Sequence, residues 1–240
     1  RTLGALALTS NPKYREPFEP LPGGIKHIDP TVEALEAALD DTVAALFIEP
    51  IQGEVGVQPL PPEFLARARE LTAHRGALLV IDEVQTGIGR TGAWFGFQAT
   101  GIVPDIVTLA KGLGGGIPIG ACIAYEPAAK LFYPGSHGTT FGGNPLSCHV
   151  AQTVLDVITE DNLVENARVR GEQLSAAILQ RQHPLIKGVR GKGLLLGVLL
   201  TQDTAPALVT AAREVGLIVN SPAPDVVRLA PPLVIGDQEV

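Results

Sequence analysis

Three short apolar runs, separated by helical patterns, constrain the fold of this sequence more than any other feature. The runs are Val43–Ile48, Ala77–Ile81 and Ile106–Ala110. Between the first two, Pro61–His74 places apolar side chains at helical spacing. Short β-branched strands that alternate with helices are typical of a largely parallel sheet covered by helices on both faces. The sequence therefore predicts an α/β fold.

Each of the three apolar runs ends in polar residues. These are Glu49–Glu54 after the first run, Asp82–Gln85 after the second and Lys111 after the third. In parallel sheets, ligands bind beside the carboxyl ends of the strands. Three polar strand ends at one edge therefore predict a binding site there.

Lys111 is the candidate nucleophile of this site. It follows a buried strand and precedes a turn rich in glycine, Gly112–Gly116. Desolvation lowers the pKa of an amine, so a lysine in this position can form a Schiff base near neutral pH. Glycines allow the backbone to bend and a planar group to approach closely. A lysine that only reaches solvent beside a flexible turn fits the same residues.

Asp82, Val84 and Gln85 suggest a site for a planar heteroaromatic ring. In an extended chain Asp82 and Val84 point to one face and Glu83 to the other. The carboxylate would bond a protonated ring nitrogen, the valine would pack on the ring, and Gln85 could reach a ring substituent. A strand-end acid that caps the following turn is the alternative.

The segment LLVIDE also has the form of the Walker B strand of P-loop nucleotide hydrolases, with Asp82 on magnesium. The phosphate-binding partner motif G-x-x-x-x-G-K-[ST] is absent from these 240 residues. A P-loop hydrolase stays open as an alternative of a different class.

The second part of the chain predicts a smaller α/β domain. A helical pattern runs from Pro145 to about Gln180 and breaks near Asp161–Asn162. Strands are expected on both sides of Gly191–Gly193, at Leu217–Val219 and at Val226–Leu229. We place the domain boundary in the long helix, which gives residues 1–150 and residues 151–240.

Composition excludes several classes of partner. The net charge of −7 and the lack of a basic cluster argue against nucleic acid. No apolar run reaches the roughly 18 residues that a membrane helix needs. Cys122 and Cys148 suggest neither a disulfide framework nor a metal site, and the histidines show no ligand spacing. We expect a cytoplasmic protein without a metal.

Five segments together resemble the class III (ω-amino-acid) pyridoxal-phosphate aminotransferases, and within them the acetylornithine aminotransferase branch. The segments are EPIQGEVGV at Glu49–Val57, IDEVQTGIGRTG at Ile81–Gly92, TLAKGLGGGIPIGA at Thr108–Ala121, HGTTFGGNPL at His137–Leu146 and VRLAPPL at Val227–Leu233. They follow the order and spacing of the family over nearly the whole chain. The resemblance implies the fold type I architecture of aspartate aminotransferase, with a mostly parallel sheet in the large domain and a small C-terminal α/β domain.

The same resemblance implies roles for the polar residues around the predicted ring site. Lys111 would hold pyridoxal 5'-phosphate as a Schiff base and move the proton during the reaction. Asp82 would pair with the ring nitrogen, Val84 would lie under the ring, and Gln85 would bond its phenolic oxygen.

Four further residues receive roles only from the resemblance. Thr140, together with Thr139, would cross a homodimer interface to the cofactor phosphate of the partner. Arg228 would bind a substrate carboxylate, and Glu54 would pair with Arg228 and move away when that carboxylate binds. Without the resemblance, the threonines are plain loop hydroxyls, Arg228 a surface arginine and Glu54 a solvated acid.

The implied reaction is amino transfer between N2-acetylornithine and 2-oxoglutarate, giving N-acetylglutamate 5-semialdehyde and glutamate in arginine biosynthesis. Ornithine, succinylornithine and 4-aminobutyrate aminotransferases share these segments and stay open. The chain contains no methionine, opens on Arg1 within an apolar pattern, and ends where Asp237 could cap a helix. We therefore expect a fragment that lacks the N-terminal part and the last C-terminal helix, and that alone binds the cofactor weakly, if at all.

Overall fold

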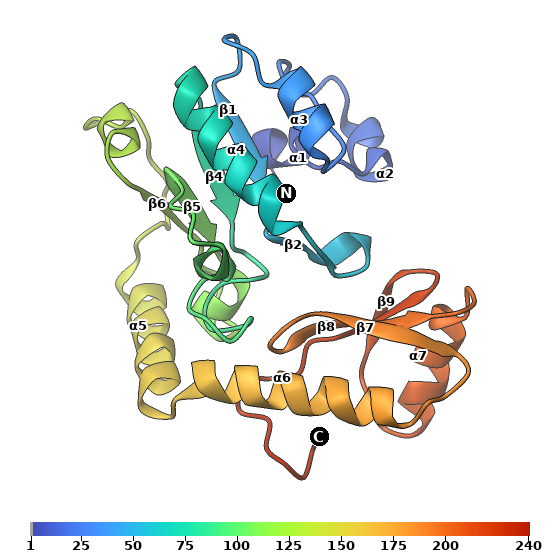
Figure 1. Cartoon of the computed structure of the whole chain (residues 1–240). Helices are drawn as coiled ribbons and strands as arrows, with labels where there is room; N and C mark the ends of the chain where they lie inside the picture. Colours follow the sequence, from blue (N-terminus) through green and yellow to red (C-terminus); the bar gives the residue numbers. More distant parts are fainter. Residues whose placement is uncertain (1) are drawn as a thin grey trace.

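The computed structural model describes residues 2–240 of the chain; Arg1 lies outside the described residues. Two four-stranded sheets are joined by the helices α5 (Pro145–Glu160) and α6 (Leu163–Gln180), as Figure 1 shows. A small two-stranded ribbon is formed by β2 (Ile51–Gln52) and β3 (Gln58–Pro59). In the sequence it lies between the first and the second strand of the first sheet.

The first sheet has the strand order β1-β4-β5-β6. Its strands are β1 (Ala45–Ile48), β4 (Leu78–Asp82), β5 (Ile106–Leu109) and β6 (Ala121–Ala124). The first three are parallel and β6 is antiparallel to β5. The predicted α/β fold with a mostly parallel sheet is confirmed. Because β1, β4 and β5 run in one direction, their carboxyl ends meet at one edge of the sheet.

Helix α4 (Pro62–Arg75) shows how the sequence forms these elements. A proline at its first position fits the start of a helix, and Gly76 ends it with a left-handed backbone at φ 69°. Phe64, Leu65 and Ala68 are buried and pack into the main core with Leu79 and Ile81 of β4. The helix thereby covers β1 and β4.

Shorter helical elements complete the first part of the chain. They are α1 (Leu3–Ala7), α2 (Pro12–Arg15), η1 (Glu16–Phe18), α3 (Val32–Ala38), η2 (Gly53–Val55), η3 (Gly96–Thr100), η4 (Lys111–Gly114) and η5 (Ala128–Leu131). None of the helices within residues 2–240 is long and apolar enough to cross a membrane.

The predicted break in the long helical pattern is confirmed at Asp161–Asn162. Asn162 takes a left-handed backbone at φ 52°, which an α-helix cannot continue through. Helix α5 therefore packs against η4, the short helix that follows β5, and α6 packs against the second sheet. The domain boundary near residue 150 stays a prediction.

The second sheet is antiparallel, with the order β7-β8-β10-β9. Its strands are β7 (Ile186–Lys192), β8 (Leu195–Leu200), β9 (Asn220–Ala223) and β10 (Val226–Leu229), and α7 (Ala205–Glu214) packs on β9 and β10. The predicted hairpin around Gly191–Gly193 is confirmed. The predicted strand at Leu217–Val219 is wrong, because pairing with β10 begins only at Asn220. Ile218 is 90% exposed.

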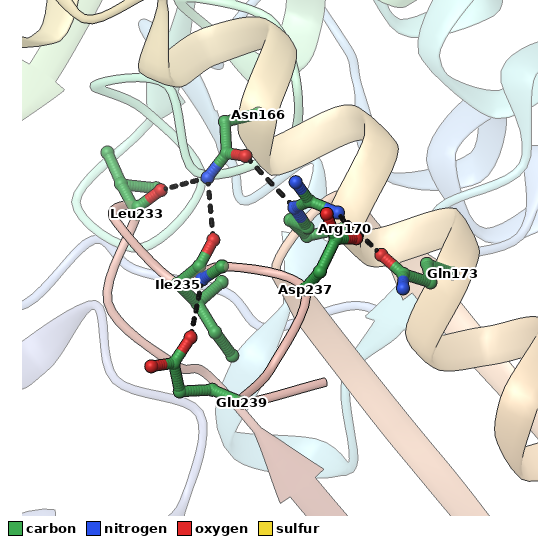
Figure 2. Close-up of polar contacts among 8 residues, drawn as sticks. Asn166, Arg170, Gln173, Leu233, Ile235, Asp237 and Glu239 are labelled. Carbon is green, nitrogen blue, oxygen red and sulfur yellow. Dashed lines mark hydrogen bonds and ion pairs between the residues drawn. The ribbon is translucent and has the colours of Figure 1, made fainter.

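The segment after β10 returns along α6, where two side chains of that helix hold it (Figure 2). Asn166 Nδ2 donates to the backbone oxygens of Leu233 at 2.7 Å and Ile235 at 3.0 Å. Arg170 forms an ion pair with Asp237. Asp237 is therefore an ion-pair partner here, and no helix is formed within residues 230–240.

Candidate active site

A cavity of about 740 Å³ opens beside the carboxyl ends of β4 and β5. Val84, Gln85 and Lys111 line it from the first sheet, α5 contributes Val154, and Arg228 lines it from the second sheet. The cavity therefore lies where the two sheets and α5 meet, at the sheet edge where the sequence predicts a site.

Lys111 is the first residue of η4 and has a positive φ of 45°. This left-handed backbone is uncommon for a residue other than glycine. Although the lysine reaches solvent, desolvation by the surrounding atoms lowers the pKa of its amine below the usual value. Glu54, Glu49 and Asp82 act against this lowering through their charges. A lowered pKa leaves more of the amine uncharged and nucleophilic at neutral pH.

Asp82 ends β4, and its Oδ1 accepts a hydrogen bond of 2.9 Å from the backbone N–H of Val84. This bond caps the turn after the strand, which is the alternative role that the sequence leaves open for Asp82. It occupies one oxygen of the carboxylate and orients the group, so the capping bond and a ligand role are compatible.

Glu49 is an acidic neighbour of Asp82, and the sequence patterns indicate no specific role for it. The pairing of Ile48 with Ile81 places Glu49 and Asp82 side by side at the ends of parallel strands. Burial, and after it the charge of Asp82, raise the pKa of Glu49 to about 7 against the opposing charge of Lys111. The sequence places both residues at one sheet edge, and the strand register adds that they are direct neighbours.

One hydrogen-bonded network joins Glu54, Gln85 and Arg228, of which Gln85 and Arg228 line the cavity. Arg228 Nη1 donates to Glu54 Oε1 at 2.9 Å and to Gln85 Oε1 at 3.3 Å. Gln85 Nε2 donates to the same Glu54 oxygen at 3.2 Å. The hydrogen bond from Arg228 is the main cause that lowers the pKa of Glu54. The predicted partners Glu54 and Arg228 thus lie together, and Gln85 joins them.

Thr139 and Thr140 lie apart from this network. Both are exposed in the loop before α5 and do not line the cavity. The structure gathers Val84, Gln85, Lys111 and Arg228 around the cavity. Asp82 is hydrogen-bonded to Val84 and Glu54 to Arg228, whereas the two threonines lie outside this group.

Two further residues of the segment Ile81–Gly92 bond neighbouring loops and the second part of the chain. Glu83 is 1% exposed, and its carboxylate accepts bonds from Thr86 Oγ1 at 2.5 Å and from the N–H groups of Gly96 and Phe97 at 2.9 Å. Arg90 Nη1 donates to the carbonyl oxygens of Leu194 and Pro231 in the second part of the chain. The partners of Arg90 lie more than 100 residues away in the sequence, so the local pattern does not indicate its role.

Comparison with known proteins decides the family. The family model described as Aminotransferase class-III matches residues 1–240. The chain belongs to the class-III aminotransferases. The acetylornithine aminotransferases of Mycobacterium tuberculosis and Streptomyces coelicolor are 56% and 54% identical to it over its full length. The chain spans about 60% of the length of these curated relatives.

Solved structures of class-III aminotransferases and their neighbours have the same fold. The ornithine aminotransferase of Toxoplasma gondii superposes with a TM-score of 0.93 at 38% identity, covering 100% of this chain and 59% of that one. The acetylornithine aminotransferase of Elizabethkingia anophelis gives 0.84 at 39% identity, covering 91% of this chain and 57% of that one. These neighbours have fold type I. The findings favour the aminotransferase prediction over the P-loop hydrolase.

The aminotransferases of this class depend on pyridoxal 5'-phosphate; another structure of the Toxoplasma gondii enzyme contains it at partial occupancy in the active site. The residues of this chain fit that group. An amine with a lowered pKa and a valine line the cavity, and a carboxylate that ends β4 lies at the same edge of the sheet, where its charge acts on that amine. These are the three groups that an aldehyde on a protonated aromatic ring requires.

Proposed function

We propose that these 240 residues are part of an enzyme that transfers the amino group of N2-acetylornithine to 2-oxoglutarate. The products are N-acetylglutamate 5-semialdehyde and glutamate, and the pathway is arginine biosynthesis. The observation that carries the proposal is the placement of Lys111 and Arg228 around one cavity, with Asp82 close enough to Lys111 to act on its charge and Glu54 hydrogen-bonded to Arg228. The names of relatives at 51–56% identity support acetylornithine as the donor.

Four residues would hold pyridoxal 5'-phosphate. Lys111 would bind its aldehyde carbon, Asp82 its ring nitrogen, Val84 one face of the ring and Gln85 the ring oxygen. When bound, the cofactor supplies an electron sink for the pair of electrons left when the substrate loses a proton. The Asp82 carboxylate keeps a proton on the ring nitrogen, because an opposite charge favours the protonated form.

The Lys111 amine would then act as the acid–base group. Its lowered pKa lets it exist uncharged, so it can take a proton from one substrate carbon and return it at another. The nearby Glu49 has a pKa of about 7 and sits close enough to influence the charge of Lys111.

Arg228 and Glu54 would select substrates by charge. The planar guanidinium of Arg228 suits a carboxylate bound through two hydrogen bonds. Glu54 occupies that guanidinium in the structure. When 2-oxoglutarate or glutamate binds, its second carboxylate would replace Glu54, whose exposed side chain is free to swing away.

The enzyme would act as a homodimer in the cytoplasm, with Thr140 and Thr139 reaching the cofactor phosphate of the partner. Their loop is exposed and lies outside the cavity of its own chain, and Phe141 beside it is 81% exposed. A large apolar side chain in such a loop is suited to a protein contact. Both cysteines are free thiols, which fits a reducing compartment.

Absorbance spectroscopy of the full-length protein tests the proposal. The purified enzyme should show a visible band with pyridoxal 5'-phosphate, and borohydride should fix the cofactor to Lys111, as peptide mass spectrometry would reveal. Lys111→Ala is the matched control and should lose the trapped adduct. Failure to trap the cofactor on Lys111 would refute the assignment.

Turnover on four amines then tests the donor. N2-acetylornithine should give the highest kcat/KM among N2-acetylornithine, ornithine, succinylornithine and 4-aminobutyrate, each with 2-oxoglutarate as acceptor. A higher value for one of the other three amines would move the enzyme to that branch and leave the aminotransferase mechanism intact.

A further inference from the structure

Arg190 lies directly opposite Arg228 across one residue of the second sheet. In the register of the strands, Gly197 of β8 pairs with Arg190 of β7 on one side and with Arg228 of β10 on the other. Side chains of directly paired residues in neighbouring strands point to the same face. The two arginines therefore flank a gap left by a glycine.

The turn that carries Glu54 lies in this gap. Arg190 donates from Nε at 2.9 Å and from Nη2 at 2.7 Å to the backbone oxygen of Gly56. Arg228 Nη1 donates to the backbone oxygen of Gly53 at 3.2 Å. The turn is thus held at both of its ends by arginines of the second sheet, although it follows β1 and β2 in the sequence.

Gly197 permits this close approach. A Cβ atom at that position would lie 3.1 Å from the Gly56 oxygen and 3.1 Å from Val57 Cβ. Val57 itself is fully buried and packs with Ile51 and Leu195. Its backbone has φ 54°, which is an outlier for a β-branched residue and needs strong packing to persist. The turn is therefore fixed to the second sheet by apolar packing as well as by hydrogen bonds.

The two arginines differ in what they hold. Arg228 bonds the Glu54 carboxylate and, through the same Nη1 atom, the Gly53 oxygen. A substrate carboxylate that takes Arg228 would compete with both bonds. Arg190 bonds only the backbone of the turn in the structure, so its bonds do not depend on whether Arg228 holds Glu54 or a substrate.

We propose that Arg190 is a positioning residue, which fixes the Glu54 turn on the second sheet and so sets how strongly Glu54 competes with a substrate carboxylate for Arg228. This inference rests on the proposed function, because it assumes that Arg228 binds the carboxylate. Without Arg190, the turn loses one of the two arginines that anchor it to the second sheet, and Glu54 spends less time at Arg228. The arginine then becomes more available to 2-oxoglutarate.

Steady-state kinetics of the full-length enzyme tests the inference through Arg190→Gln. The KM for 2-oxoglutarate should fall by roughly threefold or more, the size typical for directly coupled residues. In an enzyme that already carries Glu54→Gln, adding Arg190→Gln should change this KM by less than about twofold, because the competitor is gone. An equal change in both backgrounds, or no change in the parent, would overturn the inference.

Two further variants separate positioning from loss of charge or of folding. Arg190→Lys keeps the charge but offers one donor atom in place of two, so its effect should lie between those of the parent and Arg190→Gln. Lys192→Gln removes a positive charge from an exposed position of the same strand and should leave the KM unchanged. An effect of Lys192→Gln equal to that of Arg190→Gln would contradict the specific role of Arg190.

Hydrogen exchange provides a readout that does not need turnover. Backbone amides of residues 51–60 should exchange faster in Arg190→Gln than in the parent or in Lys192→Gln, measured without substrate. Unchanged exchange there would show that Arg190 does not anchor the turn. If the parent enzyme has no aminotransferase activity, the proposed function fails, while the exchange measurement still decides whether the anchor exists.

Discussion

At the scale of single residues, Asp82→Asn tests the role of the strand-end carboxylate. Asparagine keeps the size and the turn-capping acceptor but cannot pair as an anion with a protonated ring nitrogen. Breaking a buried charge pair costs roughly 3–5 kcal/mol, so the transamination rate should fall by about two to four orders of magnitude. The rate should be compared with that of Asp203→Asn, which changes an exposed acid between β8 and α7. A loss of only a few-fold would contradict the proposed role.

Glu49 leads to a prediction about pH. Its pKa rises from 4.5 to about 7 in the folded chain, mainly through burial. As the pH rises through this window, the unfolded chain releases the proton first, so the parent loses stability. Glutamine does not titrate, so Glu49→Gln does not lose this stability. Its free energy of unfolding minus that of the parent should increase by up to roughly 3 kcal/mol as the pH rises from 4.5 to about 7, and then level off.

Urea unfolding without added cofactor at several pH values measures this difference. Glu160→Gln, at an exposed position of α5, is the matched control. A difference for Glu49→Gln that stays constant over the window would show that the burial of Glu49 does not perturb its titration.

The residues that could be predicted from the sequence are those whose roles depend on local motifs. Asp82 ends β4, Gln85 and Lys111 follow the ends of β4 and β5, and these parallel strands end at one edge of the sheet. Glu49 was expected at this edge without a role, because its pairing with Asp82 is set by strand register. Arg190 was missed because it bonds a turn about 134 residues away. Such contacts leave no mark on the neighbouring sequence.

At the scale of elements, the β7–β8 hairpin depends on a glycine at its tip. Gly193 has φ 52°, and a Cβ atom there would lie 2.5–2.7 Å from backbone atoms of Arg90, Thr91 and Gly92. Gly193→Ala should therefore lower the free energy of unfolding by roughly 2–4 kcal/mol, through overpacking and an unfavourable backbone. The denaturant midpoint measures this loss.

The same strand offers the control for that change. A Cβ atom at Gly188 of β7 would meet nothing within 4 Å, and its φ is ordinary. Gly188→Ala should leave the midpoint nearly unchanged. Equal effects at both glycines would show that the hairpin tip does not press on the loop after β4.

Element boundaries were predictable where periodicity and burial coincide. The predicted strand Val226–Leu229 and the helix break at Asp161–Asn162 match the structure. Leu217–Val219 looked equally like a strand, but Leu217 and Ile218 are exposed and pairing starts beyond Val219. An apolar run without a partner strand cannot be told apart by local pattern from one that is paired.

At the scale of the whole molecule, the role of Thr140 in the loop before α5 distinguishes two possible arrangements of the active site. Thr140 lies outside the cavity of its own chain. If Thr140 serves its own chain, every residue of a site comes from one subunit. If it serves the partner, each site of a two-fold dimer combines Lys111 of one subunit with Thr140 of the other.

Mixing two inactive variants distinguishes these arrangements. Lys111→Ala and Thr140→Val should each be strongly impaired as homodimers of the full-length protein. Unfolded together and refolded at equal amounts, they should form about half heterodimers, each with one intact site, and recover about a quarter of the parent activity. With Thr140 acting within its own chain, no subunit of the heterodimer is intact and no activity returns. Recovery near a quarter therefore requires a site shared between subunits, whereas its absence in refolded dimers excludes the proposed role of Thr140.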